Sequence, residues 1–275
     1  MSRVFYANRG EPAETVKEVL ETHAFDLIVS DTNHSGIAEL LEHHSDIHGT
    51  RTVTNLWRNP PDDERVGERF VQLLQRDGII GEADPTPHLF VSESARRGAE
   101  EALEPLSRPL VFLCPEAGMK IKAWLPERFV ALGRCLQEVC RASLVIVGLG
   151  EDAASVAKEL SALHLTGNLR DLAAALTCGD LMIAADTGPA RLAAALGTPT
   201  LTLFGPSWAG RYGQAPPQVN LQGYPACRER VVANFTEQAC WYAGVCPLGL
   251  GFDTCLETLS VEEVFAEART LLEHA

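Results

Sequence analysis

Several features are missing from this sequence of 275 residues, and each absence excludes a class of protein. No run approaches the roughly 20 consecutive apolar residues that a membrane-spanning helix needs. Residues 1–9 lack the apolar segment of a secretory signal peptide, so we expect a cytoplasmic protein. Basic residues are few, since 23 lysines and arginines stand against 37 aspartates and glutamates. The net charge of −14 argues against general nucleic-acid binding.

The eight cysteines include no Cys-x-x-Cys pair, which weakens the indication of a zinc site. Because a secretory segment is absent, we expect reduced thiols rather than a disulfide framework. Four cysteines fall in apolar stretches and are predicted to be core residues: Cys114, Cys135, Cys140 and Cys178. The other four are separated by 12, 5 and 8 residues: Cys227, Cys240, Cys246 and Cys255. We favour buried or free thiols for this group, and one shared structural metal is the alternative.

Short β-rich runs alternate with amphipathic helical stretches, which is typical of an α/β protein with parallel sheets. In the first part of the chain the pattern predicts a strand at 25–30 and helices at 14–22, 37–43, 66–76 and 92–106. A break at Ser107-Arg108-Pro109 predicts a boundary between domains 1–107 and 108–275. The second domain is predicted to contain strands at 110–114, 144–148, 181–185 and 200–204, with helices at 126–140, 152–163 and 169–178.

Polar or glycine-containing loops follow the strands of the second domain. In open parallel sheets, ligands bind outside the carboxyl ends of the strands. We therefore expect four loops to converge on one ligand, beginning at Pro115, Gly148, Asp186 and Gly205.

The most informative stretch, residues 186–197, joins a predicted strand to an alanine-rich helix. The free N–H groups at such a helix start favour a phosphate, and Thr187 can add a hydroxyl donor. Gly188 allows close approach to the backbone, and Pro189 fits a first turn. The alternative is that Asp186 and Thr187 only cap the helix.

Five ordered stretches, at 115–118, 122–129, 186–197, 203–207 and 255–259, together resemble glycosyltransferase family 9, which includes the bacterial ADP-heptose:lipopolysaccharide heptosyltransferases. The resemblance covers roughly residues 108–272. It implies a GT-B-like α/β fold of two Rossmann-like domains with parallel sheets facing across a cleft. The first domain is expected to be incomplete, because the strand, Gly-Asp loop and helix that open the family are not found.

The resemblance also implies a nucleotide-sugar donor site. Its expected residues are Ala117, Gly118, Lys122, Glu151, Asp186, Thr187, Gly188 and Arg191. Lys122 and Arg191 would stabilise the leaving diphosphate, and Glu151 would accept hydrogen bonds from ribose hydroxyls. The resemblance further implies inverting transfer by direct displacement. No Asp-x-Asp motif is present, so we expect no metal or other cofactor.

Some of these residues also have a purely structural interpretation. Lys122 could be a solvated surface residue, and Glu151 could be a charge at a helix start. Trp124 is predicted to pack in the core rather than to stack on a base.

Three residues depart from the family pattern, and one of them, Gly118, stands where the family has a hydroxyl-bearing Ser or Thr. Arg191 stands where the family has a histidine. Unlike histidine, arginine keeps a permanent positive charge that can bind phosphate. Glu116 replaces a glycine, and its carboxylate is unfavourable near a diphosphate unless Lys120 or Arg191 pairs with it. The general base is not identified. Asp31 or His34 could face the cleft, but a solvated loop is the favoured interpretation.

The expected function is transfer of a heptose or related sugar from a nucleoside diphosphate, with ADP-heptose favoured, to a lipopolysaccharide-type or other glycan acceptor. A lipid-linked acceptor implies transient contact with the inner face of the inner membrane, although the acidic first half offers no obvious patch for anionic lipids. A catalytically silent nucleotide-sugar-binding or scaffold protein is the alternative. A cysteine-bound metal protein is a third hypothesis.

Overall fold

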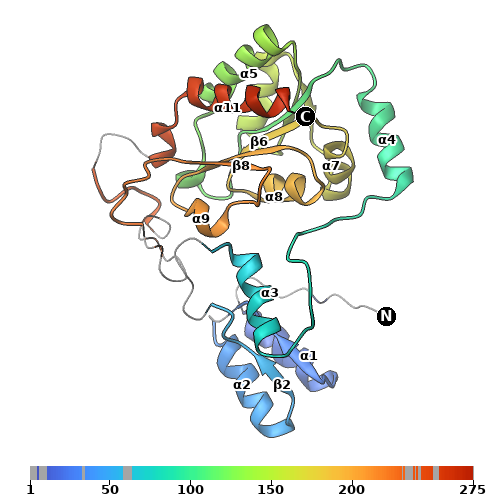
Figure 1. Ribbon diagram of the computed structural model, residues 1–275, viewed down its shortest axis with the longest axis vertical. Coiled ribbons are helices and arrows are strands. Elements are labelled where there is room, and N and C mark those ends of the chain that lie inside the picture. Colours follow the sequence, from blue (N-terminus) through green and yellow to red (C-terminus); the bar gives the residue numbers. More distant parts are fainter. Residues whose placement is uncertain are drawn as a thin grey trace. The chain divides into compact units, whose positions relative to one another are not determined.

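The computed structural model describes residues 5, 11–32, 35–57, 64–230, 232, 238, 240, 243–249 and 254–274 (Figure 1). It contains two compact units, Met1–Pro60 with Arg69–Ala83, and Pro61–Glu68 with Asp84–Ala275. The assignment of 1–107 and 108–275 to acceptor-side and donor-side domains stays a prediction. Among the described residues, no helix is both long enough and apolar enough to span a membrane.

The first unit contains a small parallel sheet of β1 (Leu27–Val29) and β2 (Arg51–Val53). Its helices are α1 (Pro12–Thr22), α2 (Ile37–His48) and most of α3 (Val66–Arg76). Val53, Leu56 and Leu73 form its core. The predicted strand and three helices are confirmed, although the helix predicted at 37–43 continues for five more residues, to His48. The three-residue β2 was not predicted.

Two residues of the first unit were candidates for an acceptor-side role. Asp31 lies two residues after the end of β1 and is exposed, which agrees with the interpretation that it belongs to a solvated loop. Its backbone carbonyl accepts a hydrogen bond from the Trp57 indole at 2.7 Å. His34 lies outside the described residues.

The second unit is built on six parallel strands in the order β5-β4-β3-β6-β7-β8. The strands are β3 (Leu110–Cys114), β4 (Ser143–Val147), β5 (Leu163–Leu165), β6 (Leu181–Ala185), β7 (Thr200–Phe204) and β8 (Val219–Gln222). The chain moves outward from β3 to β5 and then restarts on the other side of β3 at β6. This reversal of strand order is the point where doubly wound folds bind their ligands.

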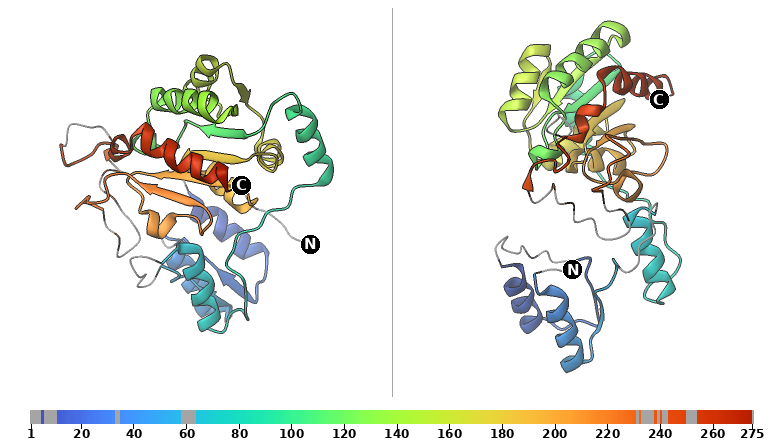
Figure 2. Two further views of the ribbon diagram at one scale, coloured as in Figure 1. Left: turned by 45° about the horizontal axis from the view of Figure 1, so that its top comes forward. Right: turned by 90° about the vertical axis from the view of Figure 1, so that its left-hand side faces the viewer.

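Helices cover both faces of this sheet (Figure 1, Figure 2). One layer contains α5 (Pro126–Cys140), α6 (Glu151–Leu160) and α11 (Val261–Glu273). The other contains α4 (Glu93–Leu103), α7 (Leu169–Leu176) and α8 (Gly188–Ala195). Shorter helices are η1 (Lys120–Lys122), α9 (Ala209–Tyr212) and η2 (Cys255–Thr258).

The alternation of side chains along β3 explains the two layers. Val111 and Leu113 pack under α5 and α6, whereas Phe112 and Cys114 pack toward α7. All five residues of β3 are buried, and their apolar run fits a strand covered on both faces. Cys114 and Cys178 are buried as predicted, and Cys135 and Cys140 are half-buried.

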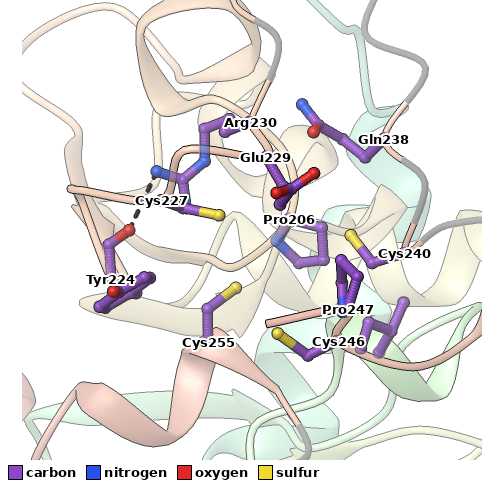
Figure 3. Close-up of a pocket in the computed structure, with 11 residues that line it drawn as sticks. Pro206, Tyr224, Cys227, Glu229, Arg230, Gln238, Cys240, Cys246, Pro247 and Cys255 are labelled. Carbon is purple, nitrogen blue, oxygen red and sulfur yellow. Dashed lines mark hydrogen bonds between the residues drawn. The ribbon is translucent and has the colours of Figure 1, made fainter. Parts of the chain in front are cut away.

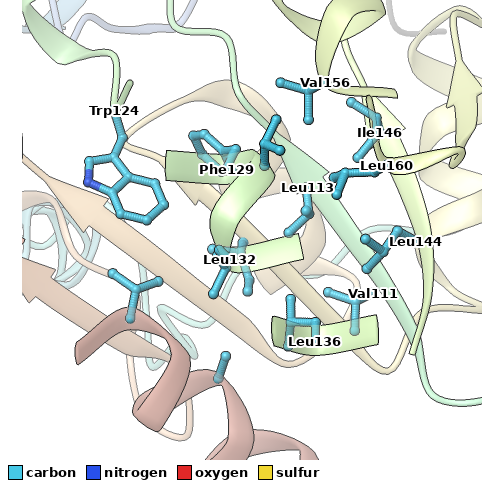
Figure 4. Close-up of a cluster of buried hydrophobic side chains, with 14 of the residues drawn as sticks. Val111, Leu113, Trp124, Phe129, Leu132, Leu136, Leu144, Ile146, Val156 and Leu160 are labelled. Atoms are coloured by element: carbon cyan, nitrogen blue, oxygen red, sulfur yellow. The ribbon is translucent and has the colours of Figure 1, made fainter. Parts of the chain in front are cut away.

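Trp124 is fully buried, which confirms its packing role (Figure 4). Its ring meets Phe129 edge to face at a centroid distance of 5.0 Å, and its indole N–H donates to the Leu259 carbonyl at 3.1 Å. The Arg128 guanidinium also donates to the Glu257 and Leu259 carbonyls, at 2.7 Å each. The motifs at 122–129 and 255–259 therefore hold each other in place.

The predicted strands at 110–114, 181–185 and 200–204 are confirmed to the residue, and 144–148 is shifted by one. The helix predicted at 152–163 is wrong at its end. Ser161 adopts a left-handed backbone conformation that stops α6, and Leu163–Leu165 then pairs with β4 as β5. Neither β8 nor α11 was predicted.

Candidate functional site

A cavity of about 730 Å³ opens in the second unit at the carboxyl ends of β3, β4, β5 and β6. Three of the loops predicted to converge line it, those that begin at Pro115, Gly148 and Asp186. The fourth prediction is wrong for this cavity, because the Gly205 loop follows β7, one strand further from the reversal point. The loop after β5 provides the remaining wall.

Asp186 is the electrostatic centre of the cavity. Its side chain is only 7% exposed and meets two cations, Lys122 Nζ at 3.2 Å and the Arg191 guanidinium at 2.7 Å. Burial opposes ionisation, but the charges of Lys122 and Arg191 outweigh it and hold the pKa of Asp186 below its ordinary value. Two positively charged side chains therefore converge on one carboxylate.

The N-terminus of α8 lies beside this group. Thr187 precedes the helix, but its side chain makes no capping hydrogen bond. The Thr187 hydroxyl oxygen is buried and has no hydrogen-bond partner in the described part of the chain. A side chain added at Gly188 would meet no atom within 4 Å. The first turn of α8 therefore offers uncapped backbone donors, a buried hydroxyl and open space, which is the arrangement expected for an anion site.

Glu116 lies in the same cavity and was expected to need Lys120 or Arg191 as a partner. The structure gives it different partners, because its carboxylate accepts hydrogen bonds from backbone N–H groups at the start of α6. The distances are 3.1 Å from Leu149 N, 2.7 Å from Gly150 N and 3.4 Å from Ala153 N. The protein's own carboxylate thus occupies the positive end of α6.

The predicted donor residues do not all reach the cavity. Ala117, Gly118, Lys122, Asp186, Thr187 and Gly188 line it. Arg191 reaches it only through Asp186. Glu151 is exposed in the first turn of α6 and is not among the lining residues, so its ribose role stays a prediction.

The apolar wall of the cavity was missed by the sequence analysis. Leu149 and Leu169 line it and are 78% and 74% exposed, which is unusual for large apolar side chains. Asn168, between β5 and α7, caps α7 by accepting from Arg170 N and Asp171 N at 2.9 and 3.2 Å. A leucine between Gly148 and Gly150 and a leucine after a helix cap were the available signals.

Residues 40–238 match the sequence profile of glycosyltransferase family 9 (heptosyltransferase). Curated proteins give no sequence match. Among solved structures, a glycosyl transferase family 9 protein from Veillonella parvula DSM 2008 superposes with a TM-score of 0.71 and 19% identity, covering 95% of this chain and 78% of that one.

Two E. coli enzymes share the fold. Heptosyltransferase WaaC with ADP gives a TM-score of 0.58 at 15% identity, covering 94% of this chain and 76% of its own. ADP-heptose lps heptosyltransferase II gives 0.57 at 17% identity, covering 97% and 82%. The profile match spans most of the sequence. The chain therefore belongs to glycosyltransferase family 9.

Proposed function

We propose that this protein transfers a heptose or a related sugar from a nucleoside-diphosphate donor, with ADP-heptose favoured, to a lipopolysaccharide-type or other glycan acceptor. The observation that carries the proposal is the buried, unpaired Thr187 hydroxyl at the uncapped start of α8, beside the pair of cations on Asp186. A diphosphate would satisfy these donors.

We propose that the diphosphate binds between the first turn of α8 and the Lys122 ammonium. Lys122 comes from η1, after β3, and Arg191 is on α8 itself, so two separate segments supply the positive charge. Asp186 holds both cations in position before the ligand arrives, which reduces the reorganisation needed on binding. An ammonium and a helix start can stabilise a leaving diphosphate without a metal ion.

In this proposal the nucleoside packs against the two exposed leucines of the cavity. Leu149 lies in the loop after β4 and Leu169 is the first residue of α7, and a flat base between them would remove both side chains from water. A volume of about 730 Å³ falls in the range of small-molecule sites, about 300–1,000 Å³. The E. coli relative WaaC, whose structure contains ADP, supports this choice of donor.

The reaction is proposed as a direct displacement. An acceptor hydroxyl attacks the anomeric carbon, a carboxylate takes its proton, and the bond to the diphosphate oxygen breaks with its electron pair on the departing nucleoside diphosphate. Lys122 and Arg191 stabilise that growing charge, and the sugar inverts its configuration. The protein would act at the cytoplasmic face of the inner membrane and touch the membrane only transiently.

The test is release or transfer of sugar from ADP-heptose by the purified chain, followed by mass spectrometry. Lys122→Ala should lower kcat/KM by at least about 10-fold, since a hydrogen bond to a charged group contributes about 1.5–3 kcal/mol. Lys120→Ala is the matched control, because Lys120 is exposed in the same short helix and does not line the cavity. Equal activity of both variants would contradict the assignment of Lys122.

A catalytically silent nucleotide-sugar-binding protein is the second candidate, favoured by the Glu116 carboxylate inside the cavity. It predicts ADP binding that Lys122→Ala weakens, with no turnover on a panel of donors and acceptors. Turnover by the wild type that Lys122→Ala reduces would exclude it.

A further inference from the structure

The Glu116 carboxylate is a fixed part of the donor cavity. Its two oxygens accept hydrogen bonds from Leu149 N and Gly150 N at 3.1 and 2.7 Å. The glycines of this loop make room for it, because a Cβ atom at Gly150 or Gly148 would lie only 2.5 or 2.7 Å from a Glu116 oxygen. The same loop is also held by His164, whose Nε2 lies 3.0 Å from the Gly148 carbonyl oxygen. A negative charge is therefore built into the cavity wall.

This charge lies where the ribose of a bound nucleotide would lie. The inference rests on the proposed function, which puts the diphosphate at the start of α8 and the base against Leu149 and Leu169. Leu149 follows β4 and α8 follows β6, and β3 lies between these two strands. The ribose that joins the base to the diphosphate would therefore cross the carboxyl ends of β4 and β3. Glu116 comes two residues after β3 and is hydrogen-bonded to the loop after β4.

No cation of the described chain balances this charge. Asp186 meets two cations, whereas Glu116 forms an ion pair with none of the described side chains. Among the lining residues that the structure describes, Lys122 is the one lysine or arginine, and it is paired with Asp186 beside α8. The N–H groups at the start of α6 would attract an anion, but they already bind Glu116. A phosphate on the ribose would be repelled here, and would reach α6 only by displacing the carboxylate.

We propose that Glu116 is a specificity-determining residue, which makes the donor cavity reject nucleoside diphosphates that carry a further phosphate on the ribose. Nucleotides with both ribose hydroxyls free are accepted. Dinucleotide-binding folds separate these two classes by side-chain charge near the ribose, with an acidic residue for a free 2′-hydroxyl and an arginine for a 2′-phosphate. Because both Glu116 oxygens already accept backbone hydrogen bonds, Glu116 acts by repulsion and not by binding the ribose hydroxyls.

A second pocket of the same unit offers no alternative place for a nucleotide. It has a volume of about 20 Å³, which holds one water molecule and not an organic ligand. Figure 3 shows the sulfur atoms of four free, half-buried cysteines around this space: Cys227, Cys240, Cys246 and Cys255. Selection between nucleotides is therefore assigned to the donor cavity.

The experiment is isothermal titration of the full chain with ADP, 2′-phospho-ADP and 3′-phospho-ADP, which share the base and the diphosphate. The wild type should bind both ribose-phosphorylated forms at least about 10-fold more weakly than ADP, since the added phosphate carries nearly two charges. The penalty should decrease at high salt, because screening weakens repulsion between charges. Rejection by shape alone would not depend on salt in this way.

Two substitutions separate charge from shape. Glu116→Gln keeps the size of the side chain and should reduce the penalty to about threefold or less. Glu116→Gly should reverse the preference, because the N–H groups of Leu149 and Gly150 then become available to the ribose phosphate. Asp152→Asn is the matched control. It removes the same charge from the first turn of α6, but Asp152 is exposed and does not line the cavity, so the penalty should stay within about twofold of the wild type.

Two results would overturn the inference. One is wild-type protein that binds either ribose-phosphorylated form within about twofold of ADP. The other is a folded Glu116→Gln variant, as judged by circular dichroism, that keeps the full penalty. If the variants do not fold, the wild-type penalty and its salt dependence decide alone. ADP binding without discrimination would overturn this inference and leave the proposed function standing, whereas a wild type that does not bind ADP would overturn both.

Discussion

The carboxylate of Glu116 gives the account a prediction in which two properties change in opposite directions. Glu116→Gln removes a negative charge from the wall of the proposed donor cavity and from the positive end of α6. The first loss should tighten the binding of a nucleoside diphosphate. The second should destabilise the fold. A residue that contacted the ligand favourably would change binding in the other direction.

The magnitudes follow from the geometry. A sphere with the cavity's volume of about 730 Å³ is about 11 Å across, so an anion at its centre lies about 6 Å from a carboxylate on its wall. At an effective dielectric constant of about 40, each unit of ligand charge is then repelled by about 1.4 kcal/mol. Two charges, reduced by screening at physiological salt, leave about 1 kcal/mol, or about fivefold in Kd. Loss of the charged hydrogen bonds to Leu149 N and Gly150 N should lower the free energy of unfolding by about 1–2 kcal/mol.

The assay is isothermal titration of ADP into the wild type and Glu116→Gln at two salt concentrations, with urea unfolding of both proteins. Glu138→Gln, an exposed charge change on α5, is the control and should alter neither quantity by more than about 0.5 kcal/mol. The gain in ADP affinity should shrink at high salt. Weaker ADP binding by Glu116→Gln would refute the reasoning, because it would mean that the carboxylate accepts a hydrogen bond from the ligand.

Three further predictions concern other parts of the second unit. The lowered pKa of Asp186 means that folding stabilises its ionised form. The difference in unfolding free energy between the wild type and Asp186→Asn should therefore be constant above about pH 5 and decrease below pH 3.8. Urea unfolding of both proteins at a series of pH values would measure this difference. Leu132→Ala should lower the free energy of unfolding by about 2–5 kcal/mol, and Val139→Ala, on the exposed side of the same helix, by less than about 0.5 kcal/mol; equal losses would contradict the core assignment. Leu149→Ser and Leu169→Ser should each weaken ADP about fivefold and leave pyrophosphate binding unchanged in competition titrations, whereas equal losses for both ligands would exclude a nucleobase at this wall.

The sequence predicted the parts of the fold that depend on local patterns. The buried run at Leu110–Cys114 and the proline that starts α5 are local signals, and both elements were predicted to the residue. The strands β2 and β5 have three residues each, too few to show a period. Their existence depends on pairing with β1 and β4, which no single stretch of sequence contains.

The candidate site also combines features that a local stretch of sequence predicts with features that only the folded structure reveals. The start of α8 was predicted as a phosphate site from residues that are adjacent in the chain, although that role stays a prediction. The partners of Glu116 are backbone N–H groups 33 and 34 residues later, and a backbone group has no signature in the sequence. The meeting of Lys122 with Asp186 across 64 residues likewise follows from the neighbouring positions of β3 and β6.

A crystal structure of the protein with ADP would test the central claim most directly. The account predicts the diphosphate at the first turn of α8, with a phosphate oxygen within hydrogen-bond distance of the Thr187 hydroxyl and of Lys122 Nζ, and the base against Leu149 and Leu169. A diphosphate bound elsewhere, with the Thr187 hydroxyl still unpaired, would contradict it.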